Sequence, residues 1–217
     1  NEYFFNKGYT LFATKQYKSS KQFFEKVNNL PDYEYDANYY LGLSYFKLAQ
    51  YSEGIEAFSS AVNIDDSVFE YHFNLGLSYL KISEVDAQNP EYEKAVDSFI
   101  NSISLNNEDS KAHYNLGIAY FNLNLFGESI DEFKSALNIH QTNPNTHYQL
   151  GKAYFALERW QDSVLSNISA LELDPKHSKS HFQLGMTYLK LDDKGSAFDE
   201  YKVLKKHEIQ KSRIDVQ

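Results

Sequence analysis

The sequence predicts an all-α protein made of six consecutive copies of one helix pair. Two observations carry this prediction. A word such as AHYNLGIAYF recurs along the chain with small changes, and a glycine inside it returns at a nearly constant interval. Successive glycines are 34, 34, 41, 34 and 34 residues apart, an interval typical of helical repeat arrays. These glycines are Gly8, Gly42, Gly76, Gly117, Gly151 and Gly185.

The glycine steps divide the chain into six repeats, which we expect to form one domain over residues 1–217. The repeats cover residues 1–34, 35–68, 69–109, 110–143, 144–177 and 178–211, and residues 212–217 form a short extension. The third repeat is longer by seven residues, which fall within 83–91. This insertion predicts a longer first helix or a projecting loop; the alternative is a partner-specific contact on a rim.

Each repeat should contain two helices, because apolar residues recur at helical spacing in both of its halves. In the fourth repeat this spacing predicts helices over 111–122 and 127–138. The second helix carries a small residue at one position and, in all copies but one, an aromatic residue four places later. The two rows are Ser20, Gly54, Ala95, Ser129, Ser163 and Ala197, then Phe24, Phe58, Phe99, Phe133, Asn167 and Tyr201. Small residues on both helices allow their axes to approach closely.

This pattern resembles the tetratricopeptide repeat family over essentially the whole chain. In the fourth repeat the family's pattern is met by Leu116, Gly117, Tyr120, Ser129, Phe133 and Ala136. The resemblance implies a right-handed superhelical α-solenoid of antiparallel helix pairs, whose first helices line a concave groove. It also implies a protein that binds other proteins or peptides, usually without catalysis.

The groove side of the first helix carries an aromatic row beside an amide row. We count positions from the first residue of each repeat, omitting the insertion, so that the marker glycine is position 8. Position 5 is aromatic in every copy, and position 6 is Asn or Gln in five copies. An amide offers both a donor and an acceptor to a peptide backbone. The predicted peptide-binding residues in these rows are Asn6, Tyr39, Phe73, Asn74, Tyr114, Asn115, Tyr148, Gln149, Phe182 and Gln183. The alternative is that much of the aromatic row packs between neighbouring helices.

Charge is distributed unevenly along the chain. Residues 1–109 hold 8 lysines against 17 acidic residues, whereas residues 110–217 hold 13 basic and 13 acidic residues. Lys111, Lys152 and Lys179 should make the later part of the groove basic and orient an acidic ligand segment toward repeats four to six. The alternative is that they are ordinary solvated lysines. The net charge of −9 opposes binding to phosphate backbones, so we expect no nucleic-acid partner.

Other classes of function find little support in the sequence. The chain has no cysteine, and no apolar run is long enough to insert into a membrane. Histidines stand at position 4 in four repeats: His72, His113, His147 and His181. Equivalent residues of stacked repeats lie roughly 10 Å apart, too far to share one zinc ion, so we expect packing histidines, no metal and no cofactor. We see no motif of a catalytic centre, and we expect no enzyme activity.

The sequence therefore favours a non-enzymatic scaffold or adaptor that binds a peptide or partner segment in the groove. One subgroup of the family grips chaperone tails with two-carboxylate clamps, but Lys111 and Asn115 match only fragments of that clamp. The alternative is a structural assembly module that acts through self-association, including a homo-oligomer through the C-terminal end, or through docking to attached domains. No leader is visible, which slightly favours the cytoplasm, although export remains open if a leader was removed.

Overall fold

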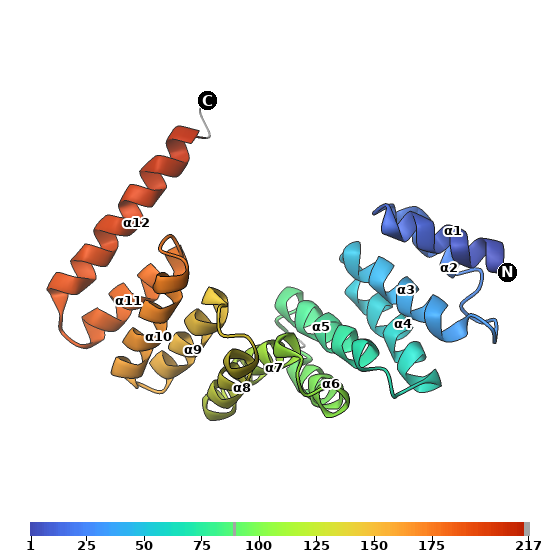
Figure 1. Ribbon diagram of the computed structural model, residues 1–217, viewed down its shortest axis with the longest axis horizontal. Helices are drawn as coiled ribbons and strands as arrows, with labels where there is room; N and C mark the ends of the chain where they lie inside the picture. The colour runs from blue at the N-terminus through green and yellow to red at the C-terminus, as the bar shows by residue number, and fades with distance from the viewer. Residues whose placement is uncertain (89, 215–217) are drawn as a thin grey trace. The chain divides into compact units, whose positions relative to one another are not determined.

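The structure, a computed structural model, describes residues 1–88 and 90–214, without the side chains of residues 34, 35 and 207–214. This part of the chain contains twelve α-helices, which follow one another in chain order and pack as antiparallel pairs (Figure 1). The predicted all-α fold class is confirmed. The chain divides into two compact units, residues 1–119 and 120–217, and each is described by itself. The single domain expected over residues 1–217 stays a prediction.

The first unit holds the first three helix pairs and most of a seventh helix. Within it, each helix from α1 to α5 packs on the next one along the chain, and α3 also touches α1 and α5. The helices are α1 (Glu2–Ala13), α2 (Tyr17–Phe24), α3 (Glu34–Lys47), α4 (Tyr51–Ile64), α5 (Phe69–Val85), α6 (Tyr92–Leu105) and α7 (Ser110–Asn122).

The second unit begins near the end of α7 and holds the last five helices. Consecutive helices again pack on each other, and α9 touches α11. These helices are α8 (Phe126–Ile139), α9 (Pro144–Ala156), α10 (Trp160–Leu173), α11 (Ser178–Lys190) and α12 (Lys194–Ile214). The bounds of α7 and α8 agree with the predicted helices over 111–122 and 127–138 to within one residue.

The two helices of a pair are joined by the same tight turn in five repeats. Position 15 has a left-handed backbone there, with φ between 57° and 62°. The next backbone N–H donates to the carbonyl oxygen five residues earlier, as in Gln50 to Tyr45 at 2.9 Å, which is the Schellman pattern of helix ends. The residues with positive φ are Lys15, Ala49, Asn124, Glu158 and Asp192. Only the third repeat, which carries the insertion, lacks such a residue among those described.

An aromatic pair closes the hairpin beside this turn. In the fifth repeat the ring of Phe155, at position 12, lies 4.9 Å from that of Trp160, at position 17, in an edge-on arrangement. Equivalent pairs join Phe12 to Tyr17 and Phe46 to Tyr51, each at 5.4 Å. Edge-on aromatic contacts of this kind stabilise by about 0.5–1.5 kcal/mol beyond their buried area. Position 12 therefore serves the hairpin itself in these repeats.

The core of the first four repeats lies at position 24, where the aromatic ring fills the space beside the marker glycine. Phe24, Phe58, Phe99 and Phe133 are each 0% exposed. The fifth repeat has Asn167 instead, also 0% exposed. Its Nδ2 donates to the Ser163 carbonyl oxygen at 2.8 Å, whereas Oδ1 has no hydrogen-bond partner among the described residues.

The insertion of the third repeat lengthens α5 and adds a loop. Helix α5 has 17 residues and ends at Val85, and α6 begins at Tyr92. The loop is tied back to the helix, because the Glu91 backbone N–H donates to Ser83 Oγ at 2.6 Å. Of the two expected forms, the structure shows the longer first helix. The contact with a partner at this rim stays a hypothesis.

Candidate peptide-binding face

Two of the predicted residues of the first unit are engaged with each other. Tyr39 and Asn74 lie on α3 and α5, and the Asn74 Nδ2 group donates to the Tyr39 hydroxyl oxygen at 3.4 Å. Burial, followed by the nearby Glu70 carboxylate, raises the pKa of Tyr39 to about 12, so its hydroxyl keeps its proton. The ring also packs on Tyr71 at 5.0 Å. The structure thus shows Tyr39 as part of the packing between first helices.

The other predicted residues of the first unit differ in how accessible they are. Asn6 and Lys111 are exposed, whereas Phe73, Tyr114 and Asn115 are half-buried. The Asn115 Nδ2 group donates to the Lys111 carbonyl oxygen at 2.8 Å, and Asn74 makes the same bond to Glu70. Each amide group therefore already donates one of its N–H hydrogens within its own helix. A ligand can bond only to the groups that remain, such as the side-chain carbonyl oxygen.

In the second unit, two lysines on neighbouring helices stand out. Lys152 is half-buried on α9, and its ammonium lies 4.2 Å from the centre of the Phe121 ring. Burial, followed by the positive charge of Lys179 on α11, lowers the pKa of Lys152. Among the described side chains, neither lysine forms an ion pair with a carboxylate. The protonated form of Lys152 is therefore destabilised, and a bound anion next to it would stabilise that form.

The remaining predicted residues of this unit are placed unevenly around these lysines. Tyr148 is half-buried with its ring 5.5 Å from that of His177, and Gln149 is half-buried as well. Phe182 is 59% exposed, whereas Gln183 is buried at 9% exposure. Lys179 is thus near enough to Lys152 to lower its pKa, and Phe182 lies on the same helix as Lys179, whereas Gln183 is buried.

The histidines of position 4 have a shared structural role. In four repeats, Nε2 donates to the backbone carbonyl oxygen six residues earlier, at distances between 2.9 and 3.3 Å. This bond fastens the start of each first helix to the turn that precedes it. Over the described residues, no group of three or more His, Cys, Asp or Glu side chains is arranged to hold a metal ion.

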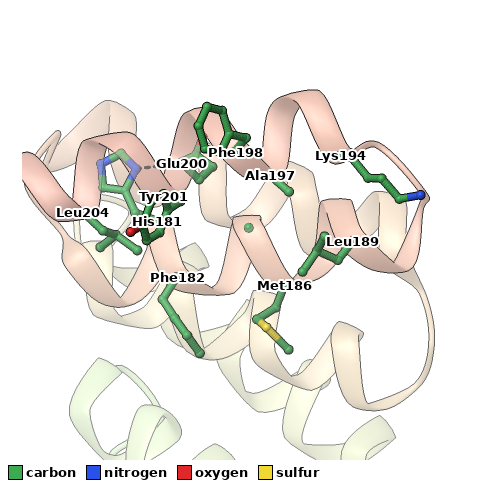
Figure 2. Close-up of a pocket in the computed structure, with 11 residues that line it drawn as sticks. His181, Phe182, Met186, Leu189, Lys194, Ala197, Phe198, Glu200, Tyr201 and Leu204 are labelled. Carbon is green, nitrogen blue, oxygen red and sulfur yellow. Dashed lines mark hydrogen bonds and ion pairs between the residues drawn. The ribbon is translucent and has the colours of Figure 1, made fainter.

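Sequence reasoning missed an apolar cavity between α11 and α12. It has a volume of about 330 Å³, and Figure 2 shows that its side chains come from both helices. The Leu189, Phe198 and Tyr201 side chains that line it are each more than half exposed. One signal was present in the sequence: Tyr201 stands at position 24 of the last repeat, where a following helix would be needed to cover it.

Within the described part of the chain, no helix has both the length and the apolar character needed to cross a membrane.

The fold and the repeat geometry define a class of protein, an array of antiparallel helix hairpins with a period of 34 residues. Family models for the tetratricopeptide repeat match residues 2–31 and 36–65, and a further TPR repeat model matches residues 123–158. The chain is a tetratricopeptide repeat protein. A search of curated proteins found no match.

Several solved structures share this fold. A crystal structure of MamA is 18% identical, covers 80% of this chain and 97% of its own, and has a TM-score of 0.74. MamA from Desulfovibrio magneticus RS-1 is 16% identical, with coverages of 81% and 96% and a TM-score of 0.75. YrrB, described as a TPR protein with an unusual peptide-binding site, is 18% identical, with coverages of 82% and 88% and a TM-score of 0.72. At these identities the likeness establishes the fold alone.

Proposed function

We propose that this chain is a non-enzymatic adaptor whose second unit binds a peptide segment with acidic and apolar side chains. The observation that carries the proposal is the pair of lysines on α9 and α11. Lys152 is half-buried and its pKa is lowered by burial and then by Lys179, yet among the described side chains neither has an acidic partner. A carboxylate of a ligand would relieve both the desolvation of Lys152 and its repulsion from Lys179.

The same helices offer apolar and hydrogen-bonding groups for the rest of the peptide. Phe182 is 59% exposed on α11, and Gln149 is half-buried on α9. An exposed aromatic ring contributes binding energy at low entropic cost, and an amide can pair with the ligand backbone. The site would therefore recognise one acidic residue of the ligand and an apolar residue near it.

The family supports the same general function. Tetratricopeptide repeat proteins typically mediate protein–protein interactions, and YrrB is described as having a peptide-binding site. The hairpin array positions side chains on rigid helices and is generally non-enzymatic in this family. We infer that the partner is a protein segment and that no reaction is catalysed.

The proposal is tested by selecting ligands from a phage library of short random peptides. The full chain and the double variant Lys152→Gln/Lys179→Gln are used in parallel. We expect the unchanged chain to enrich peptides with Asp or Glu next to an aromatic or aliphatic residue, with affinities that fall as salt is added. The double variant should lose this enrichment. Enrichment of the same peptides by both chains, or of peptides without an acidic residue, would overturn the proposal.

A further inference from the structure

The last repeat exposes the side chain at position 24, which is buried in the other five repeats. Position 24 is 0% exposed in repeats one to five, whereas Tyr201 in the sixth is 54% exposed. Position 21 is half-buried or buried in repeats one to five, whereas Phe198 in the sixth is 58% exposed. Large apolar side chains that gather exposed on one face of a protein mark an interaction site.

The first junction shows what covers these positions elsewhere. Phe24 and Val27, at positions 24 and 27 of repeat one, form one buried cluster with Ala37 and Leu41 of α3. The Tyr40 ring of α3 stacks on Phe24 with centroids 5.6 Å apart and planes at 16°. The first helix of the next repeat therefore covers these positions, and its residues at positions 3, 6 and 7 make the contact.

The covering helices share a residue pattern. Position 7 is Leu in repeats two to six, and position 10 is Ser, Ala or Thr. Position 10 touches position 20 of the preceding repeat, as Ser44 Oγ to Ser20 Oγ at 3.4 Å and Thr187 Oγ1 to Ser163 Oγ at 3.1 Å. A small residue is needed there because the two helices approach closely. Most of the covering helices therefore have a leucine at position 7, with one small residue four places before it and another three places after it.

The last repeat keeps the side chains that receive such a helix. Ala197 retains the small residue of position 20, and Tyr201 retains the aromatic ring of position 24. Leu204 stands where repeat one has Val27, and it lines the cavity of about 330 Å³ together with Tyr201 and Phe182. Most of the lining residues are apolar, and Figure 2 also shows Lys194 and the paired His181 and Glu200 among them. This face therefore matches the first junction in both its small and its large residues.

The first helix of a second copy of this chain does not fit the face. Helix α1 carries Lys7 at position 7, where the five later repeats have leucine. Lys7 is exposed in the structure. Stacking α1 of a second copy on α11 and α12 would bring this ammonium into a mostly apolar junction. The carboxylate that lines this face, on Glu200, is already paired with His181, so burying the ammonium there is costly. Head-to-tail assembly is therefore disfavoured by a single residue.

We propose that the face formed by α11 and α12 binds an amphipathic α-helix of a partner protein, which lies across it as the first helix of a further repeat would. The partner helix carries a small residue, then an aromatic residue three places on, a leucine four places on and a small residue seven places on. In α3 these residues are Ala37, Tyr40, Leu41 and Ser44. This site shares Phe182 with the proposed adaptor face, but it does not use the lysine pair and does not depend on it.

The chain itself supplies a probe for this site. A fluorescent peptide of residues 36–48, held helical by a lactam bridge on its solvent side, is titrated with the full chain. We expect saturable binding, weakened at least about tenfold by Tyr201→Asp and by Phe198→Asp, since truncated aromatic anchors have effects of this size. Leu165→Asp is the matched control, because Leu165 on α10 is also an exposed apolar residue at 63% exposure. It should change the affinity by less than about twofold.

Three further results decide the proposal. Circular dichroism of both variants should match the unchanged chain, since Tyr201 and Phe198 are more than half exposed. Lys152→Gln should leave this binding intact, which separates the site from the adaptor face. The proposal is overturned if the peptide binds Tyr201→Asp as well as it binds the unchanged chain. It is also overturned if the peptide does not bind. In that case sedimentation shows whether the face joins two copies of the chain, as a dimer that is lost in Tyr201→Asp, or whether the chain is a monomer; neither result rescues the proposal.

Discussion

At the scale of single residues, the marker glycine decides how closely the two helices of a repeat approach. A Cβ atom added to Gly42 would lie 2.7 Å from two carbons of the Phe58 ring, which is 0% exposed and cannot turn away freely. A Cβ added to Gly76 would lie 2.9 Å from the Phe99 ring. The glycine is therefore required by the aromatic ring at position 24.

Replacing Gly42 by alanine should lower the free energy of unfolding by about 1–3 kcal/mol, because the core becomes overpacked. Gly127→Ala is the matched control, since a Cβ there meets no atom within 4 Å. Gly127 lies in the first turn of α8, and its replacement should raise stability by about 0.5 kcal/mol. Urea unfolding followed by circular dichroism measures both. Equal effects of the two substitutions would contradict the role given to Gly42.

At the scale of one element, the turn between paired helices places non-glycine residues in the left-handed region. Ala49 has a φ of 57°, and a side chain in this conformation costs roughly 1 kcal/mol that glycine avoids. Asn124 at the equivalent position has a φ of 61°, and asparagine tolerates it better. The Schellman hydrogen bonds at the helix end thus hold this position at a positive φ even where the residue is not glycine.

Ala49→Gly should therefore stabilise the chain by about 0.5–1 kcal/mol, in spite of the greater entropy of glycine when unfolded. Asn124→Gly should change the stability by less. Both are measured as the urea midpoint at constant slope. A loss of stability in Ala49→Gly would mean that the alanine makes a contact that outweighs the strain of its backbone.

The start of α11 should respond to acid. His177 is the N-cap, and its Nδ1 accepts a hydrogen bond from the Ser180 backbone N–H at 3.3 Å. Burial lowers the pKa of His177 from 6.5; Asp174 opposes this, while Lys179 and His181 add to it. The unfolded chain binds this proton more tightly, so the stabilising contribution is complete above about pH 6.5 and is lost as the pH falls below it.

The variant His177→Asn isolates this effect, because asparagine caps a helix well and does not titrate. We expect the stability of the unchanged chain to fall relative to the variant between about pH 7 and about pH 5. Urea unfolding across this range measures the difference. A difference that stays constant, or that changes in favour of the unchanged chain at low pH, would contradict the role of His177.

At the scale of the whole molecule, the fold was predictable because every repeat must solve the same packing problem. The glycine spacing fixed the register, and the register correctly placed small residues at position 20 and rings at position 24. It also identified the histidines of position 4 as packing residues, although their bond to the preceding turn was not foreseen. The division into two units left no comparable mark in the sequence.

The candidate site was less predictable, because a helical period indicates a face and not the use of each side chain. Asn74 and Asn115 were expected to meet a ligand, and the structure shows each donating to a carbonyl of its own helix. Gln183 is buried although Gln149, at the same position, is half-buried. The exposure of Tyr201 depends on what lies next to it in space, which its own repeat does not encode.

The most direct test of the adaptor proposal is the affinity of one selected acidic peptide for two lysine variants of the full chain. Fluorescence anisotropy gives the dissociation constant for Lys152→Gln and for the control Lys176→Gln, whose lysine is exposed in a turn. We predict a loss of about tenfold for Lys152→Gln, equivalent to about 1.4 kcal/mol, and less than about twofold for the control. Equal affinities for the two variants would contradict the central claim that the half-buried Lys152 on α9 binds the acidic group of a peptide.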